Sequence, residues 1–228
     1  MLKSLMATGL ICLFVAFSTH AQECAHFLFL QKNKVVEETI YNKKGEPNGK
    51  KVYEVSDVST NGGTTTAKLN SEIFDKKGKS IAKSTSSVQC TGGAILIDMK
   101  MMMPDQDNQQ QTYDVDASAQ GNYIDYPYSM KPGDDLKDGN FTMDMKKGTI
   151  AQTVNMQITQ RKVLAQESIT TPAGTWDCFK ISSHNHVGIK TGFITIPFNV
   201  DVTEWYAPGF GIIKTESKHG STLITSIK

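Results

Sequence analysis

The segment ITIPFNVDV, residues 194–202, decides the fold because its side chains alternate strictly in polarity. Every even position is apolar, whereas the odd positions hold threonine, proline, asparagine and aspartate. Successive side chains of a β-strand point to opposite faces of the sheet. The segment therefore predicts a strand with one buried face and one face in solvent.

Similar alternation recurs elsewhere in the chain. Residues 141–146 and 150–158 place their apolar side chains largely at every second position, and no window has the spacing of an amphipathic helix. We expect ten or eleven strands joined mostly by short turns, which favours antiparallel neighbours. Without helices, only the sheet itself can cover its apolar face. The sequence thus predicts an all-β fold with a single antiparallel, strongly curled sheet, a barrel or half-barrel meander, and a sandwich is the alternative.

Two segments that are near copies, YNKKGE (41–46) and FDKKGK (74–79), predict hairpin turns. The side chain of the asparagine or aspartate can bond to the backbone that follows it, and the glycine can adopt the left-handed conformation.

The first 21 residues predict a secretory signal peptide. Lys3 provides the positive start, an apolar run too short to span a bilayer follows, and the small residues Thr19 and Ala21 precede the cut. We expect cleavage after Ala21 and export to the periplasm or out of the cell. The remaining residues, 22–228, are expected to form one all-β domain with no transmembrane segment.

The charge balance excludes some partners. The chain has 24 basic and 23 acidic residues, a net charge of +1, which gives no overall signature of binding to nucleic acid or to an anionic membrane. It contains no phosphate-binding glycine loop, nucleophile elbow or paired-carboxylate motif. We therefore expect no nucleic-acid partner, no cofactor and no enzymatic activity.

Three of the four cysteines, Cys24, Cys90 and Cys178, lie beyond the predicted signal peptide. Because an exported chain meets an oxidising compartment, we expect one disulfide and one buried thiol, and all three pairings remain open. Lipid modification of Cys24 is disfavoured because glutamine and glutamate, not small residues, precede it.

Cys178 and His184 lie roughly 20 Å apart along one predicted strand, too far apart to form a catalytic pair.

Two histidines are weak candidates for a metal site. His184 and His186 share one face of a predicted strand, a spacing at which two imidazoles can bind one zinc or copper ion. A site needs a third ligand, and the sequence does not indicate one. We therefore expect no bound metal.

Several apolar stripes are rich in methionine, whose side chain adapts to varied apolar ligands. If the concave face of the sheet is open, these stripes would line a site for an apolar molecule. The residues of this hypothetical lining are Met99, Met101, Met103, Phe141, Met143, Met145, Met156, Ile194, Ile196 and Phe198.

Five segments together carry a family resemblance: ESITTPAGTWDCFKI (167–181), TEWYAPGFGIIKTES (203–217), FDKKGKS (74–80), IDMK (97–100) and LKDGNFTM (136–143). They resemble a TapB-like family of uncharacterised exported bacterial proteins of the domain-of-unknown-function type, and the resemblance covers most of the mature chain. It implies an all-β envelope protein and provides no catalytic residue.

Two functions follow from these observations. The sequence favours a structural or interaction role in the envelope without catalysis, with an envelope protein as partner. The alternative is a periplasmic carrier or binding module that holds an apolar, lipid-like small molecule on the concave face lined by methionine and phenylalanine.

Overall fold

The structure of the chain is a computed structural model that describes residues 24, 26–102, 113–114, 123–147 and 150–228. The predicted signal peptide, its cleavage site and Met103 lie outside the described residues.

The described residues form an all-β fold, as the alternation of polarity predicts. Two short 3-10 turns, η1 (Leu28–Leu30) and η2 (Met99–Met102), accompany the strands. The strands are β1 (Val35–Asn42), β2 (Pro47–Asn61), β3 (Thr64–Asp75), β4 (Ser80–Cys90), β5 (Ala94–Asp98), β6 (Tyr113–Asp114), β7 (Tyr123–Pro127), β8 (Gly139–Lys147), β9 (Ile150–Thr171), β10 (Gly174–Thr191), β11 (Ile194–Ala207), β12 (Gly211–Ser217) and β13 (Gly220–Ile227).

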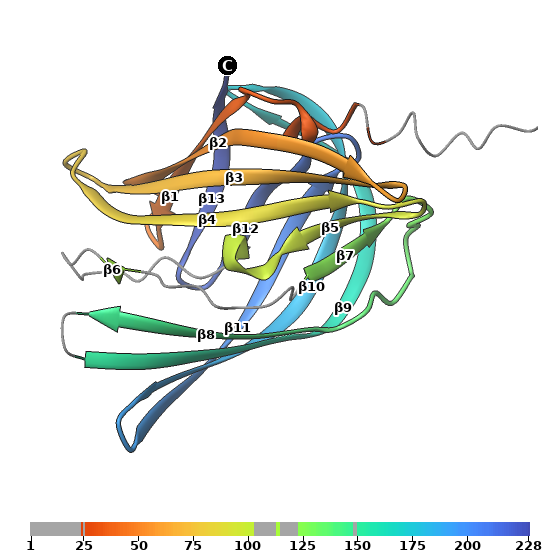
Figure 1. The fold of residues 1–228 in the computed structure, drawn as a ribbon. Coiled ribbons are helices and arrows are strands. Elements are labelled where there is room, and N and C mark those ends of the chain that lie inside the picture. The colour runs from red at the N-terminus through yellow and green to blue at the C-terminus, as the bar shows by residue number, and fades with distance from the viewer. Residues whose placement is uncertain (1–23, 25, 103–112, 115–122, 148–149) are drawn as a thin grey trace, which may run out of the picture.

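These strands make one sheet that curls into a nearly closed barrel (Figure 1). The order is β3-β2-β1-β13-β12-β11-β10-β9-β8-β6-β4-β5-β7, and β3 also pairs with β4, which closes the sheet on itself while β5 and β7 continue from β4. Neighbours are antiparallel except for the short pairing of β4 with β6. The fold is the predicted curled sheet and not the sandwich. The described residues contain thirteen strands rather than ten or eleven, because short strands such as β6, which has two residues, are too brief to show a clear alternation.

Both predicted hairpin turns are confirmed. The side chain of Asn42 accepts hydrogen bonds from the backbone N–H groups of Lys44 and Glu46. Asp75 accepts equivalent bonds from two N–H groups of its own turn, and these bonds lower the pKa of its carboxyl group. Gly45 and Gly78 have φ angles of 77° and 78°, which an L side chain rarely adopts.

A bulge in β9 reverses which of its positions face the interior. Met156 and Ile158 are buried at even positions. Gln160 then has a φ of 54°, and the register between β9 and β10 shifts beside it. After this bulge the odd positions Arg161 and Val163 are buried instead. A simple alternation carried along the sequence would have placed Arg161 in solvent.

The methionine stripe that follows Ala94 is not one long strand. The sequence pattern predicts that Met99 and Met101 continue the buried face of this strand, but β5 ends at Asp98 and a 3-10 turn follows. The side chain of Asp98 accepts a hydrogen bond from the backbone N–H of Lys100, which stabilises the turn. Met99 is still buried, whereas Met101 is only half-buried.

The hairpin of β10 and β11 extends beyond β12, which pairs with β11 only from Val202 onward, whereas β9 follows β10 as far as Thr191 (Figure 1). The strand predicted at residues 194–202 is present, but the burial predicted for its outer part is wrong. Ile194 and Ile196 are 68% and 64% exposed, and burial begins only at Val200. Alternation indicates which side chains share a face, but it does not indicate whether another part of the chain covers that face.

Candidate functional site

The most exposed apolar side chains of the described residues lie at the end of this projecting hairpin. Gly192 and Phe193 form the two-residue turn between β10 and β11, and Gly192 has a φ of 59°. Such a glycine is typical of tight hairpin turns. Phe193 is fully exposed, and Ile194 and Ile196 follow it. We call Phe193, Ile194 and Ile196 the tip patch.

The tip patch continues an apolar face that begins inside the barrel. Within the hairpin, buried Val187 lies opposite half-buried Phe198, and Ile189 lies opposite Ile196. The side chains on this face therefore change from buried to exposed along the hairpin. Val154 of β9 is paired with Ile189 and is fully buried, so the inner part of this face belongs to the core.

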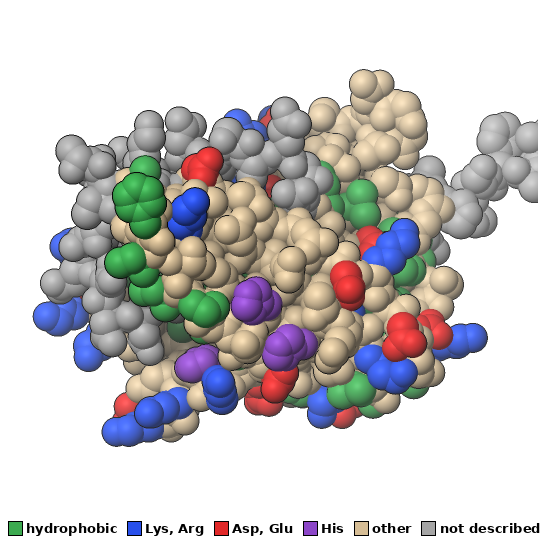
Figure 2. All heavy atoms as spheres, turned by 90° about the horizontal axis from the view of Figure 1, so that it is seen from below, with side chains coloured by type: hydrophobic (Ala, Val, Ile, Leu, Met, Phe, Trp, Pro, Cys, Tyr) green, Lys and Arg blue, Asp and Glu red, His purple; other side chains and the backbone are tan. Residues whose placement is uncertain are grey.

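The two candidate metal ligands lie on the same hairpin, but their rings bond to neighbouring side chains. Nδ1 of His184 is 2.8 Å from a carboxylate oxygen of Asp201, and Nδ1 of His186 is 2.6 Å from the amide oxygen of Asn199. Figure 2 shows histidine side chains on the face seen from below, with hydrophobic side chains at the end toward which the hairpin projects. Among the described residues, no three His, Cys, Asp or Glu side chains are grouped to hold a metal ion.

A buried charged cluster lies inside the barrel and was not predicted. Arg161 is fully buried, and its Nη1 donates hydrogen bonds to the backbone oxygens of Asp125 in β7, at 3.1 Å, and of Lys137, at 2.9 Å. Its Nη2 is 3.7 Å from a carboxylate oxygen of Glu204 in β11. The hydroxyl of Tyr126 donates to the same oxygen at 2.9 Å. We call Arg161, Asp125, Tyr126 and Glu204 the Arg161 cluster.

This cluster connects strands that no ladder joins. Among the described strands β7 pairs with β5 alone and ends the sheet order, so the Arg161 side chain is a direct link from β9 to β7. The ring of Tyr126 stacks on that of Tyr206 at 4.3 Å, and the guanidinium of Arg161 lies 4.9 Å from the Tyr126 ring centre. The Arg161 cluster therefore stabilises the curled shape of the sheet.

Burial governs the protonation of the cluster. Loss of hydration raises the pKa of the Glu204 carboxyl group, and the nearby Arg161 guanidinium opposes this rise. Loss of hydration, together with the Glu204 charge, raises the pKa of Tyr126 far above its ordinary value, so the hydroxyl stays a hydrogen-bond donor. The one sequence feature that sets this residue apart was not used to predict the cluster: Arg161 is the only arginine among the 24 basic residues of the chain.

Four of the ten residues predicted to line an apolar site are buried in the core. Met99, Phe141, Met143 and Met156 are each at most 4% exposed. A Cβ atom at Gly139 would lie 2.9 Å from Sδ of Met99, so this methionine packs directly on backbone. The side chain of Met145 lies outside the described residues. The structure therefore shows packing around the described methionines.

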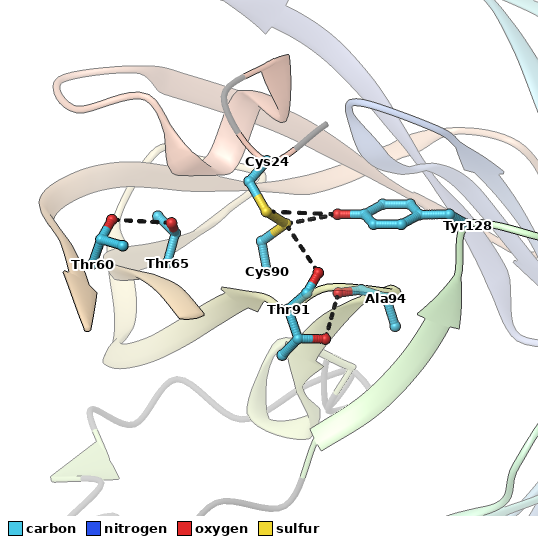
Figure 3. Close-up of a disulfide and its surroundings, with 7 residues drawn as sticks. All are labelled: Cys24, Thr60, Thr65, Cys90, Thr91, Ala94 and Tyr128. Atoms are coloured by element: carbon cyan, nitrogen blue, oxygen red, sulfur yellow. Dashed lines mark hydrogen bonds between the residues drawn. A yellow bond between two sulfur atoms is a disulfide. The ribbon is translucent and has the colours of Figure 1, made fainter. Parts of the chain in front are cut away.

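A disulfide joins Cys24 to Cys90 of β4 (Figure 3). The hydroxyl of Tyr128 lies 2.6 Å from Sγ of Cys90 and donates to it, because a disulfide sulfur carries no proton. The segment that follows Cys24 packs its Phe29 ring against those of Tyr53 and Phe210. The bond therefore fixes this aromatic segment to the barrel.

The third cysteine, Cys178, is a buried free thiol. Loss of hydration raises the pKa of this thiol to about 12, and the nearby carboxylates of Asp177 and Glu167 add to the rise. Because the thiolate is the nucleophile, this cysteine is poorly suited to catalysis.

One comparison with known proteins identifies a family for this chain. A family model described as DUF3108-like matches residues 31–227. The comparison with curated proteins found no match. In the part of the chain that the structure describes, no helix is both long enough and apolar enough to cross a membrane.

Two solved structures resemble this fold. One, from Bacteroides fragilis NCTC 9343, is described as a candidate exported protein with a YmcC-like fold. Its sequence is 23% identical to this chain, and the TM-score of the two structures is 0.70. The match covers 89% of this chain and 98% of that chain. The other, a candidate lipoprotein from Parabacteroides distasonis ATCC 8503, is 21% identical in sequence and has a TM-score of 0.71. That match covers 89% of this chain and 99% of the other chain.

At these sequence identities the likeness to the two solved structures shows the fold alone. The comparisons support an uncharacterised family but not the finer TapB-like name. Because the family model matches most of the chain, this protein belongs to the DUF3108-like family.

Proposed function

We propose that this chain is an exported protein of the bacterial envelope that acts by binding a partner through the tip patch, without catalysis. The observation that carries this proposal is the full exposure of Phe193 beside two exposed isoleucines on a projecting hairpin. Soluble proteins rarely leave contiguous large apolar side chains exposed unless the surface binds something. We place the chain near TapB-like proteins within its family on the sequence resemblance alone.

Export is supported by the N-terminal sequence and by the descriptions of the two structural neighbours. We propose cleavage after Ala21. The sulfur of Cys24 is bonded to Cys90 in the folded chain, so it is not free to carry a lipid through a thioether. Attachment to the envelope would then depend on surface contacts, of which the tip patch is the strongest candidate.

The triple variant F193S/I194T/I196T tests the tip patch in cells. Wild-type protein is expected to sediment with the membrane fraction of the producing bacterium, and the variant is expected to lose this association roughly tenfold, because apolar contact area is removed. Threonine keeps a strand-forming side chain at the two isoleucine positions. The measurement is the distribution of the protein between membrane and soluble fractions.

Leu164 provides a matched control. It is 47% exposed on β9, so L164S also removes an exposed apolar side chain but leaves the tip patch intact. We expect L164S to distribute like the wild type. Equal sedimentation of the triple variant and the wild type, with unchanged melting temperatures, would reject the tip patch as the binding surface.

A second candidate function is favoured by the apolar face that runs from the core to the tip patch. A carrier for a lipid-like molecule could hold an apolar tail along Phe198 and Ile196, which continue the buried row outside the barrel. Native mass spectrometry after incubation with a lipid extract tests this candidate. A carrier is expected to show an added ligand mass, and a spectrum of unliganded protein alone would contradict it.

A further inference from the structure

We propose that His184 and His186 form a binding site for a divalent transition-metal ion, preferably Cu²⁺, on the outer face of the β10–β11 hairpin. The site lies away from the tip patch, because His186 precedes Gly192 by six residues, which is about 20 Å along a strand. It goes beyond the proposed function and does not depend on it.

The two histidines face the same way on one strand. Both belong to β10, two residues apart, and the residue between them, Asn185, is buried. The two rings therefore lie together on the outer face, about 6.6 Å apart at the backbone. His186 is exposed and His184 is partly exposed, so an ion in solvent can reach both rings. Figure 2 shows histidine side chains near one another on the face seen from below.

The hydrogen bonds of the two rings decide which nitrogen is available to a metal. β11 places Asp201 directly opposite His184 and Asn199 directly opposite His186. Each partner presents an oxygen to the Nδ1 atom of its histidine, at 2.8 Å and 2.6 Å respectively. An ionised carboxylate and an amide oxygen can only accept, so Nδ1 is the donor in both rings. In a neutral imidazole the other nitrogen, Nε2, then carries a lone pair and no proton.

Metal-binding histidines use this same arrangement. A histidine ligand almost always donates its second ring N–H to a carboxylate, a carbonyl or water, which fixes the tautomer and makes the coordinating nitrogen more basic. Both members of the pair meet this condition, through two positions of the adjacent strand. Histidines that serve only as solvated polar residues need neither a shared face nor two oriented rings.

The charges around the two rings favour a cation. Residues 182–188 of β10, 155–160 of β9 and 197–203 of β11 face one another across the ladders and contain one charged residue, Asp201. Lys162 lies one row beyond, opposite Ser182, and its Nζ is 3.1 Å from a carboxylate oxygen of Asp135. A carboxylate beside two neutral imidazoles attracts a positive ion.

The ligand set selects the class of ion. Among the described residues no third His, Cys, Asp or Glu side chain joins the pair, so water completes the coordination. The sequence alone disfavours a metal for this reason, but it does not show the two oriented rings. Ca²⁺ and Mg²⁺ need oxygen ligands and are excluded. Imidazole suits zinc, copper and nickel, and of the divalent ions Cu²⁺ binds nitrogen ligands most tightly and accepts a tetragonal set of nitrogen and oxygen.

Calorimetric titration of the full mature chain with CuCl₂ tests the proposal. We expect the wild type to bind a single Cu²⁺ ion and to bind Zn²⁺ more weakly. H184N and H186N each remove one ligand and are expected to bind Cu²⁺ at least roughly tenfold more weakly, because even loss of a residue that only orients a ligand has an effect of this size. H26N/H219N is the matched control, since it removes two exposed histidines outside the pair.

Two further measurements separate metal binding from a structural role of the histidines. D201A keeps both ligands but removes the acceptor of the His184 Nδ1 proton, so it is expected to weaken Cu²⁺ binding about tenfold. Electron paramagnetic resonance of the Cu²⁺-loaded wild type is expected to show coupling to two imidazole nitrogens, and that of H186N to fewer. Melting temperatures of the metal-free variants verify that each one folds.

Absence of saturable Cu²⁺ binding by the wild type overturns the proposal, and so does equal binding by H184N/H186N. If D201A binds as tightly as the wild type, the oriented rings do not create the site, and the assignment built on them fails. The triple variant F193S/I194T/I196T leaves both histidines in place and is expected to bind Cu²⁺ like the wild type. Its distribution in cells therefore tests the tip patch alone, and failure of one proposal leaves the other standing.

Discussion

R161M is expected to lower the free energy of unfolding by about 3–5 kcal/mol at pH 7, because it leaves the buried carboxylate of Glu204 without its cationic partner. It also removes the two hydrogen bonds that Arg161 donates to backbone oxygens of Asp125 and Lys137. Methionine fills a similar volume, so the loss reflects charge and hydrogen bonds more than a cavity. Urea unfolding followed by circular dichroism measures this change.

The second variant, R161M/E204Q, isolates the unpaired charge. Glutamine keeps an oxygen that can accept the bond from the Tyr126 hydroxyl but carries no charge. We expect the double variant to be more stable than R161M alone. K162M is the matched control, because Lys162 is the next residue of β9 and pairs with Asp135 in solvent. An exposed pair of this kind contributes about 0–1 kcal/mol.

The pH dependence of R161M gives an independent check. Burial raises the pKa of Glu204 in the folded state, and loss of Arg161 removes the charge that opposes this rise. A folded-state pKa above the unfolded value stabilises the protein at low pH, and this stability is lost as the pH rises through the folded pKa. The deficit of R161M relative to wild type should therefore be smaller near pH 4 than at pH 7. A deficit that is equal at both pH values would contradict a charged Glu204 as its cause.

Removal of the disulfide in C24A/C90A is expected to cost about 4 kcal/mol. The bond joins residues 66 positions apart, and a cross-link over a loop of this length restricts the unfolded chain by about that amount. The native state also loses the covalent attachment of the segment that carries Phe29. Denaturant unfolding of the mature chain, with and without dithiothreitol, measures both forms.

The control for this prediction is C178A, which removes the buried free thiol and keeps the disulfide. It should cost about 1 kcal/mol, as a typical single substitution does. Dithiothreitol should destabilise the wild type and C178A to a similar degree and leave C24A/C90A unchanged. If reduction changes no midpoint, the Cys24–Cys90 bond does not stabilise the fold.

Local chemistry made much of the fold predictable. The hairpin turns at Asn42 and Asp75 depend on bonds within a few residues, so the short segments YNKKGE and FDKKGK carry all the information needed. The alternation of side chains along a strand also depends only on neighbours in sequence. From Val154 to Ile158, where the strand is regular, the buried positions are those that the alternation predicts.

Features that depend on distant residues were not predictable in the same way. The bulge at Gln160 turns Arg161 inward, and no periodic pattern shows where an extra residue interrupts a ladder. The exposure of Ile194 and Ile196 depends on how far the other strands extend beside their hairpin. The pairing of Cys24 with Cys90, rather than with Cys178, depends on the arrangement of the whole sheet.

The pairing of β1 with β13 has a consequence for the order of assembly. The backbone of Val35 exchanges hydrogen bonds with Lys228, which directly follows β13, so this edge of β1 is completed only by residues almost two hundred positions further along the sequence. During synthesis, β1 can pair with β2 early, but its other edge stays open until the final hairpin has been made. Contacts between residues so distant in sequence slow folding. A nascent chain of this protein therefore remains an incomplete, open ribbon until β13 has been made, and an open ribbon, unlike a closed barrel, can still be threaded through a narrow translocation channel.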